Sequence, residues 1–232
     1  MIQANKSILF FFDKYFSVLN IINITFLMIG LYLVFFLCDE DYVQGNIYKI
    51  IYIHVPSAWF ALFIYCIMSI CSFGHVIYNN IYCSIYASSL SYVGMMFCFL
   101  CLITGSVWGK YTWGTWWVWD PRLTSMFVLL FFYIGYVLLW SHEYYYAKLA
   151  SIVNLLGMIN IPIIKFSVNL WSSLHQTSSF VTKKGIMIDF SMLYPILFFL
   201  LSNIIIAYLF FCIRYKKIIA IRKTHRLMKK IL

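Results

Sequence analysis

Long runs of apolar residues dominate the chain, and each run is close to the length that crosses a bilayer. A transmembrane helix needs roughly 20 predominantly apolar residues, and inside lipid its backbone polar groups must be satisfied within the helix. The fifth run is short and ends near Pro162. The pattern predicts an all-α, polytopic membrane protein, a bundle of six transmembrane helices. The expected spans are residues 17–37, 57–78, 85–107, 122–141, 149–164 and 191–213.

Composition supports this fold class. Hydrophobic residues make up 64% and charged residues 10% of the 232 residues, and the mean hydropathy is +0.88. These values exclude an ordinary soluble domain. The sequence has no internal repeat and no flexible linker. We therefore expect a single membrane domain over residues 1–232.

The net charge of +10 is distributed unevenly and predicts the orientation. Lys6 and Lys14 precede the first span, and a basic tail, residues 214–232, follows the last. Six crossings place both ends on one side, and the positive-inside rule makes that side cytoplasmic. Anionic lipid headgroups account for the basic tail, so no nucleic-acid partner is expected. The outward-facing loops are then those at about 38–56, 108–121 and 165–190.

The cysteines and glycines exclude two other classes of function. Cys98 and Cys101 form a CxxC, but it lies in an apolar run without a nearby charge to lower a thiol pKa, which favours a packing role. No CxxCH haem-attachment motif occurs, so the chain is not itself a c-type cytochrome. The stretch from Gly105 to Lys110 is one residue short of a phosphate-binding loop, so an ATP-driven step would need a partner.

The most distinctive stretch is the WWD segment, residues 108–125, which reads WGKYTWGTWWVWDPRLTS. Five of the eight tryptophans fall within its first twelve residues, between two expected spans. Tryptophan is favoured at membrane interfaces. So many close together, with glycines and little charge between them, predict a flat aromatic surface at the outer face that suits a large, planar, hydrophobic ligand. The five are Trp108, Trp113, Trp116, Trp117 and Trp119.

The end of the WWD segment adds two charges and a helix start. Trp113, Trp116, Trp117 and Asp120 are spaced i, i+3, i+4 and i+7, which predicts a short interfacial helix. Asp120 before Pro121 is typical of a helix N-terminus, with the aspartate as the capping residue. Arg122 either pairs with Asp120 or accepts a ligand carboxylate, such as a haem propionate. Further candidates for a propionate, which more commonly reach lipid phosphate, are Lys110, Lys165, Lys183 and Lys184.

Two of the five histidines are expected on the outer face. His54 lies just before Pro56, which fits the first turn of the second span, and His175 lies in the third outer loop. Two neutral imidazoles that face one another across an aromatic surface are what bis-histidine ligation of haem iron requires. The alternative is that each caps a helix or contacts lipid headgroups. The others are His75, near the inner end of the second span, and His142 and His225, expected on the cytoplasmic side.

The stretch WGTWWVWDPRLTS resembles the tryptophan-rich WWD signature of proteins that handle haem for cytochrome c assembly. Its flanks, YVQGNIYKIIYIHVPSAW, LITGSVWGKYTWGTWWVWD and IPIIKFSVNLWSSLHQTSS, are similar to the same group. With six spans and this length, most of the chain is similar to the haem exporter protein C family, CcmC; the first span and the basic tail are less so. It departs at Pro121, where alanine is more usual, and proline suits the first helical position.

The resemblance implies a haem-handling transport protein rather than an enzyme. The transported ligand would be b-type haem, held on the WWD segment with His54 and His175 as iron ligands. In that family haem passes to the chaperone CcmE, with CcmA and CcmB as ABC transporter subunits and CcmD as a single-span subunit. The resemblance places the chain in the bacterial or mitochondrial inner membrane, with both termini on the cytoplasmic or matrix side. The candidate haem-binding residues are His54, Trp108, Trp113, Trp116, Trp117, Trp119, Asp120, Arg122 and His175.

Three other functions compete with this interpretation. A cytochrome c synthase can carry a WWD segment, but it has more spans and further histidines within the membrane. A b-type redox subunit usually needs histidines deep within its helices, whereas His54 and His175 are expected at the surface. An ordinary transporter usually keeps polar residues along its path, and the third to fifth spans carry almost none.

Overall fold

The computed structural model describes residues 2–141, 145–171, 173–175 and 189–231. Helices make up most of these ranges, and no β-strand occurs within them. A π-helical turn, η1 (Leu33–Leu37), continues the first helix, and a 3₁₀ turn, η2 (Asn46–Ile50), precedes the second. The α-helices are α1 (Ile2–Tyr32), α2 (Ile51–Tyr78), α3 (Ile81–Trp113), α4 (Pro121–Ser141), α5 (Ala147–Met158), α6 (Asn160–Leu170) and α7 (Phe190–Ile231).

Six helical segments are long and apolar enough to span a membrane, which confirms the predicted fold class. The fifth is built from α5 and α6, which meet at Ile159. Pro162 lies in the first turn of α6, where a missing N–H is tolerated, so this span continues past the expected end. The observed spans are Phe10–Leu37, Asn46–Tyr78, Ile81–Trp113, Pro121–Trp140, Ala147–Asn169 and Phe190–Thr224.

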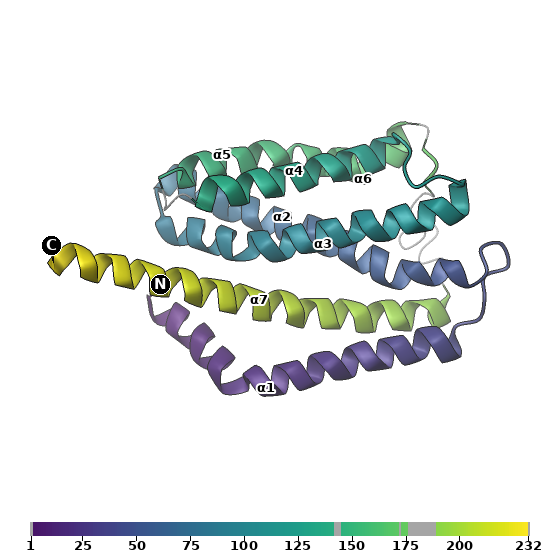
Figure 1. Ribbon diagram of the computed structural model, residues 1–232, viewed down its shortest axis with the longest axis horizontal. Helices are drawn as coiled ribbons and strands as arrows, with labels where there is room; N and C mark the ends of the chain where they lie inside the picture. The colour runs from purple at the N-terminus through teal and green to yellow at the C-terminus, as the bar shows by residue number, and fades with distance from the viewer. Residues whose placement is uncertain (1, 142–144, 172, 176–188, 232) are drawn as a thin grey trace.

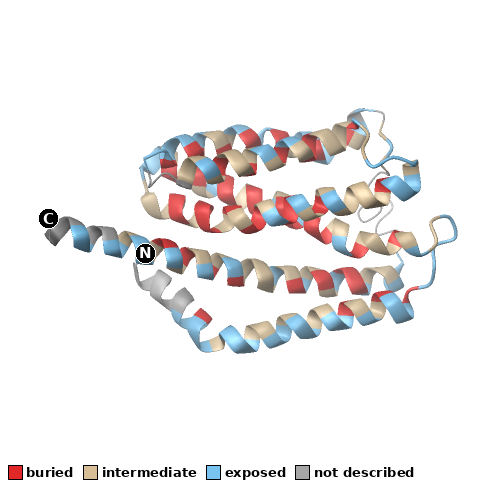
Figure 2. Ribbon diagram, in the orientation of Figure 1, coloured by how far each residue is buried: buried red, intermediate tan, exposed pale blue. Residues whose placement is uncertain are grey.

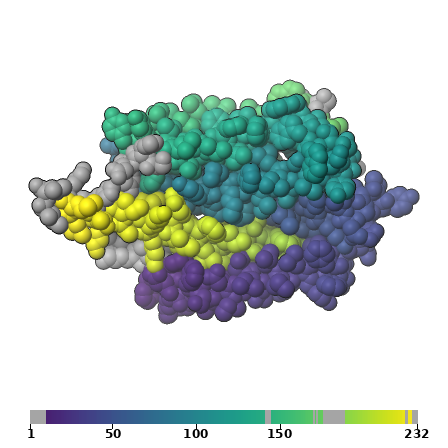
Figure 3. All heavy atoms as spheres, viewed as in Figure 1, coloured from purple at the N-terminus to yellow at the C-terminus, as the bar shows by residue number. Residues whose placement is uncertain are grey.

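The helices form two layers. Helices α2 to α6 pack against one another, and α1 and α7 run antiparallel beside them (Figure 1). Buried residues concentrate in the first group, whereas α1 is mostly exposed (Figure 2). The space-filling view shows α1 and α7 along one side of the molecule and α3 to α5 along the other (Figure 3). Because α1 packs mainly on α7 and is apolar, most of its surface is suited to face lipid.

Buried tyrosines tie the larger group together. Tyr65 and Tyr133 meet edge to face, with ring centroids 5.0 Å apart. The Tyr65 hydroxyl donates to the Asn154 carbonyl at 3.0 Å, so its buried polar atom is satisfied. Gly157 makes this approach possible, because a Cβ there would collide with the Tyr65 hydroxyl and lie 2.7 Å from the Phe132 ring.

A seam of buried polar side chains runs between α2 and α5 and along α3, contrary to the expectation that the third to fifth spans carry almost none. Asn154 Nδ2 donates to Ser72 at 3.0 Å and to Ser69 at 3.3 Å, and His75 Nδ1 lies 2.8 Å from Ser151 Oγ. Serines are easily overlooked in the apolar runs of a sequence because their side chains are small. Between helices they allow close approach and form hydrogen bonds across the interface. The predicted lack of polar residues, which argued against an ordinary transporter, is therefore wrong. The buried serines of α3 are Ser84, Ser88, Ser89 and Ser91.

The two ends of the bundle differ in what they carry. Both termini lie at one end, and residues 38–45, 114–120 and 173–175 lie at the other (Figure 1). The basic tail is a continuation of α7, in which Arg214 lies 3.7 Å from the centre of the Tyr92 ring. Because successive spans run in opposite directions, the connections after the first, third and fifth spans lie at the same end. Which side of the membrane they face stays a prediction.

Candidate functional site

The WWD segment does not form the expected interfacial helix. Helix α3 ends at Trp113, and Gly114 follows with a φ of +78°, the left-handed conformation that commonly ends a helix. Residues 114–120 are non-helical. Side chains bind the freed carbonyl groups: the Ser106 hydroxyl donates to Trp116 at 2.7 Å, and Lys110 donates to Gly114 at 3.1 Å. The helical spacing of the tryptophans was misleading because the glycine terminates α3 between them.

The five indoles also do not make one flat surface. Trp108 and Trp113 lie on the last turns of α3 and are half-buried, whereas Trp116 and Trp119 are exposed. The Trp117 ring packs against that of Trp119, nearly perpendicular to it at 81° and with a centroid distance of 5.7 Å. In the WWD segment, Trp108 and Trp113 therefore belong to the bundle, whereas Trp116 and Trp119 are exposed at its surface.

His54 is built into the helical bundle more deeply than the sequence suggested. Helix α2 begins at Ile51, so Pro56 lies inside the helix and not in a first turn after a loop. The helix starts early because the 3₁₀ turn Asn46–Ile50 leads directly into it. His54 Nδ1 lies 3.0 Å from the Cys101 carbonyl oxygen on α3. A carbonyl only accepts, so Nδ1 carries the proton and Nε2 keeps the free lone pair.

Helix α3 encloses the His54 ring. Thr104 Oγ1 lies 3.1 Å from Nδ1, and the Trp108 ring meets the imidazole edge to face at 5.8 Å. A Cβ on Gly105 would lie 2.9 Å from His54 Cε1, so only glycine leaves room for the imidazole ring at this position. Trp108 is in turn held by a hydrogen bond from its Nε1 to Gln44 Oε1 at 2.8 Å.

His175 is held differently, outside any helix. It follows the end of α6 at Leu170, and its Nδ1 lies 3.3 Å from Asp120 Oδ1. The two atoms are in close contact, although the direction of the ring nitrogen falls outside hydrogen-bond geometry. Burial lowers the pKa of His175, and the Asp120 carboxylate opposes this shift. The imidazole is therefore neutral near pH 7, and the Trp113 ring meets it edge to face at 5.0 Å.

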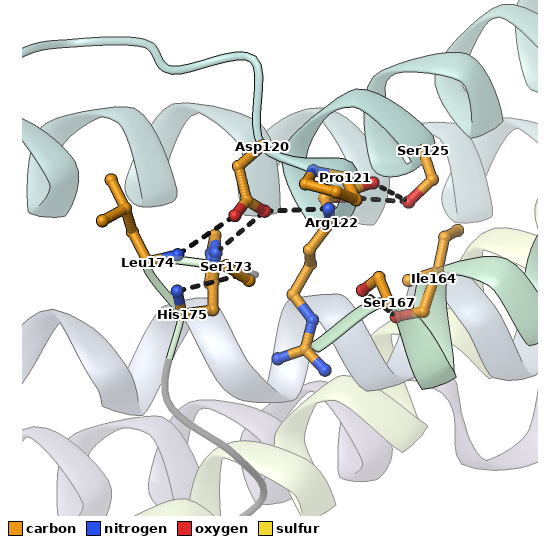
Figure 4. A network of polar contacts seen from close by, with 9 residues as sticks. All are labelled: Asp120, Pro121, Arg122, Ser125, Ile164, Ser167, Ser173, Leu174 and His175. Atoms are coloured by element: carbon orange, nitrogen blue, oxygen red, sulfur yellow. Dashed lines mark hydrogen bonds and ion pairs between the residues drawn. The ribbon is translucent and has the colours of Figure 1, made fainter. Parts of the chain in front are cut away.

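Asp120 connects the start of α4 to the His175 segment, defined here as residues 173–175 (Figure 4). Its Oδ1 accepts from the Arg122 N–H at 2.8 Å, which is the N-cap expected from the sequence. Its Oδ2 accepts from the Leu174 N–H at 3.2 Å. Burial alone would raise the pKa of Asp120, but hydrogen bonds from Ser173, Arg122 and Leu174 lower it, so the buried carboxylate is ionised.

The Arg122 guanidinium points away from the Asp120 carboxylate (Figure 4). Within the described ranges Arg122 forms no ion pair, so the alternative in which it pairs with Asp120 is not what the structure adopts. It is half-buried, and its charge lies within electrostatic reach of both His54 and His175. A half-buried guanidinium that forms no ion pair among the described residues is suited to a ligand that brings its own carboxylate.

The structure thus brings several expected residues together and leaves others apart. His54, His175, Trp108, Trp113 and Arg122 gather at the end of the bundle opposite the termini, whereas Trp116 and Trp119 face outward. Gln44, Thr104, Gly105 and Ser173 were missed. Gly105 and Thr104 lie one turn before Trp108, so helical spacing could have indicated them; nothing in the sequence marks Gln44. His142, Lys183 and Lys184 lie outside the described residues.

Comparison with known proteins gives a consistent assignment. A family model described as heme exporter protein C (CcmC) matches residues 2–230. The chain is 40% identical to a ccmC-like mitochondrial protein of cytochrome c biosynthesis from Marchantia polymorpha, over 82% of this chain and 82% of the relative. It is 42% identical to heme exporter protein C of Bradyrhizobium diazoefficiens, over 75% of this chain and 67% of the relative. Against heme exporter protein C of Escherichia coli K12 the identity is 42%, over 69% of this chain and 67% of the relative. The chain therefore belongs to the heme exporter protein C family.

Proposed function

We propose that this protein binds haem at the end of the bundle opposite its termini and delivers it to the chaperone CcmE for cytochrome c maturation. The names of the relatives support a role in haem handling for cytochrome c biogenesis. The observation that carries the proposal is the arrangement of His54 and His175. His54 directs its Nδ1 at the Cys101 carbonyl oxygen, and His175 Nδ1 lies 3.3 Å from an Asp120 carboxylate oxygen, so we take Nε2 of each ring as the nitrogen that binds iron.

The surroundings of the two rings suit a porphyrin. Trp108 stands beside His54 and Trp113 beside His175, so an apolar macrocycle would meet an indole near each axial ligand. We assign propionate binding to the half-buried Arg122 guanidinium, whose charge acts on both histidines. Aromatic contacts of this kind contribute about 0.5–1.5 kcal/mol each beyond burial. Because these contacts would supply part of the binding free energy, the bonds to iron can be weak enough to be reversible. Because no CxxCH motif is present, the haem would be held as b-type haem.

The remaining candidates have supporting roles in this proposal. Trp117 packs against the Phe127 ring at 5.5 Å and holds the WWD segment on α4. Trp116 and Trp119 are exposed and are available to the haem edge, to the membrane interface or to CcmE. Asp120 acts on haem through His175, because its carboxylate is enclosed by the protein.

The setting follows from charge and from the family. The basic extension of α7 favours the cytoplasmic or matrix side for both termini, and we therefore propose that the site lies at the outer face of a bacterial or mitochondrial inner membrane. We assign the chain a carrier role without catalysis of its own. CcmE is the proposed receiver, and CcmA, CcmB and CcmD are the proposed partners in the membrane.

The test is the absorption spectrum of the purified protein and of single histidine variants. We expect six-coordinate, low-spin haem in the unmodified protein, and weaker haem retention with loss of the low-spin spectrum in His54→Ala and in His175→Ala. His75→Ala serves as the control, because His75 contacts Ser151 in a different part of the bundle. Unchanged haem content and spectrum in both site variants would remove the assignment.

A further inference from the structure

The two proposed iron ligands are attached to the protein in unequal ways. His54 belongs to the body of α2, and its ring is enclosed by α3 through Cys101, Thr104, Gly105 and Trp108. Moving this imidazole away from its place would break these contacts between α2 and α3. These two helices share the most extensive packing contact between elements of the bundle.

Within the described residues, the His175 segment is attached through Asp120 and through the edge-to-face contact of the His175 ring with Trp113 at 5.0 Å. Among the contacts of the described residues, Asp120 accepts from the Leu174 N–H at 3.2 Å and from the Ser173 hydroxyl, and faces His175 Nδ1 at 3.3 Å. Leu174 is 54% exposed, so the apolar burial that adds to these polar contacts comes mainly from the His175 ring against Trp113. Segments with few buried contacts separate from a fold at lower free-energy cost than packed helices do.

Asp120 itself is fixed to the bundle. It is 4% exposed, its Oδ1 caps α4 through the Arg122 N–H, and its carbonyl oxygen accepts from the Thr124 N–H at 2.9 Å. The anchoring point therefore stays with α4 if the His175 segment leaves it. A carboxylate at Nδ1 also orients a histidine ligand and raises the basicity of its other nitrogen. Contact with Asp120 would thus both place His175 and strengthen its bond to iron.

We propose that His175 is the exchangeable ligand, that Asp120 is the positioning residue that holds it at the iron, and that His54 remains bound until haem leaves. The inference rests on the proposed function. Release then begins when the His175 segment separates from Asp120 and frees one axial position of the iron. The receiving protein gains access to that position while His54 still retains the haem on the bundle.

The first experiment removes the charge of Asp120 and keeps the helix cap. Asparagine caps helices as well as aspartate does, so Asp120→Asn should keep the α4 cap and accumulate in the membrane, although its single side-chain oxygen cannot also accept from the Leu174 N–H. We expect haem retention to weaken about tenfold or more, the range found when the carboxylate partner of a ligating histidine is lost. Part of the haem should change from a six-coordinate low-spin to a five-coordinate high-spin spectrum.

A double-mutant cycle then identifies which ligand Asp120 acts through. Adding His175→Ala to Asp120→Asn should cause much less loss of haem affinity than His175→Ala causes alone, because both changes disable one ligand. Adding His54→Ala to Asp120→Asn should lower haem affinity by as much as His54→Ala does in the unmodified protein. Thr104→Val is the matched control because it removes a partner of His54. Its effect on haem affinity should largely disappear when His54→Ala is already present, and should be additive with that of His175→Ala.

The rate of haem loss to an excess of an apo-haem-binding protein gives the second measurement. We expect Asp120→Asn to accelerate this loss by a factor similar to its effect on affinity. An Asp120→Asn protein with unchanged spectrum and release rate would overturn the inference, and so would a cycle in which Asp120 couples equally to both histidines. If the unmodified protein bound no haem at all, the proposed function would fail instead, which the same spectra distinguish.

Discussion

The Asp120 carboxylate lies 3.3 Å from Nδ1 of His175, although the two residues belong to different helical hairpins. The same carboxylate caps α4 through the Arg122 N–H. One buried anion therefore fixes both the end of the WWD segment and a histidine on the opposite loop. The corresponding contact of His54 is with a neutral carbonyl oxygen at 3.0 Å, so the two imidazoles meet different electrostatic environments.

Gly105 should be essential for the placement of His54. In Gly105→Ala the new Cβ would lie 2.9 Å from His54 Cε1, and the helix-bound ring has little freedom to yield. We expect a loss of about 1–3 kcal/mol in stability from overpacking, and about tenfold weaker haem retention because an iron ligand is displaced. Thermal melting in detergent and haem titration measure the two effects.

Gly135→Ala provides the control for this change. A Cβ at Gly135 meets its nearest neighbour, Val153, at an ordinary 3.9 Å. This variant should melt at the same or a slightly higher temperature, because alanine is the better helix former. If Gly105→Ala behaved like Gly135→Ala in both assays, the close approach of α3 to His54 would be wrong.

Gly157 should matter for stability and much less for haem. Alanine at this position would collide with the Tyr65 hydroxyl and approach Phe132 at 2.7 Å. We expect Gly157→Ala to lose about 1–3 kcal/mol of stability, while the haem that the folded fraction binds keeps an unchanged spectrum. A variant that melts normally yet alters the haem spectrum would show that α5 takes part in the site directly.

The tryptophans of the WWD segment should separate into two groups. Trp117 is packed against Phe127 and Trp119, so Trp117→Ala should lower stability by about 2 kcal/mol and reduce accumulation in the membrane. Trp119 is 74% exposed, so Trp119→Ala should change stability by no more than about 0.5 kcal/mol while it impairs loading of CcmE. Membrane accumulation and chaperone loading, measured side by side, test the division. Equal losses of both in both variants would contradict it.

The stabilisation by Asp120 should persist at mildly acidic pH. Hydrogen bonds outweigh burial and lower the pKa of Asp120 below its ordinary value of 3.8. A carboxyl group whose pKa is lower in the folded state contributes fully above the unfolded pKa and loses its contribution only as the pH falls through the folded value. The stability difference between the unmodified protein and Asp120→Ala should therefore not shrink from about pH 8 to about pH 5. A steady decrease over that interval would mean that the carboxyl pKa is raised.

The helices could be predicted from the sequence because apolar length alone specifies a membrane span. Capping chemistry at Asp120 and Pro121 was also evident, since a capping oxygen followed by proline has few other uses. The apparent helix from Trp113 to Asp120 was wrong because one glycine with positive φ overrides the spacing of side chains. The start of α2 was predicted too late because Pro56 suggested a first helical turn, whereas a proline can also be accommodated inside a long helix.

The site could be predicted only in part. Two histidines on one face with a tryptophan-rich segment indicated which residues to consider, and the structure brings the two imidazoles within electrostatic reach of one another. What fixes each ring was hidden, because it depends on contacts between helices. The Cys101 carbonyl, the space left by Gly105 and the carboxylate of Asp120 near His175 have no signature in a single sequence.

The most direct measurement compares the haem spectra of the purified unmodified protein and the double variant His54→Ala/His175→Ala, at equal protein concentration and with equal haem supplied. We predict a six-coordinate, low-spin spectrum with two nitrogen ligands in the unmodified protein, and no low-spin haem in the double variant. A double variant that folds, accumulates normally and retains low-spin haem would contradict the account, because the iron would then be held elsewhere.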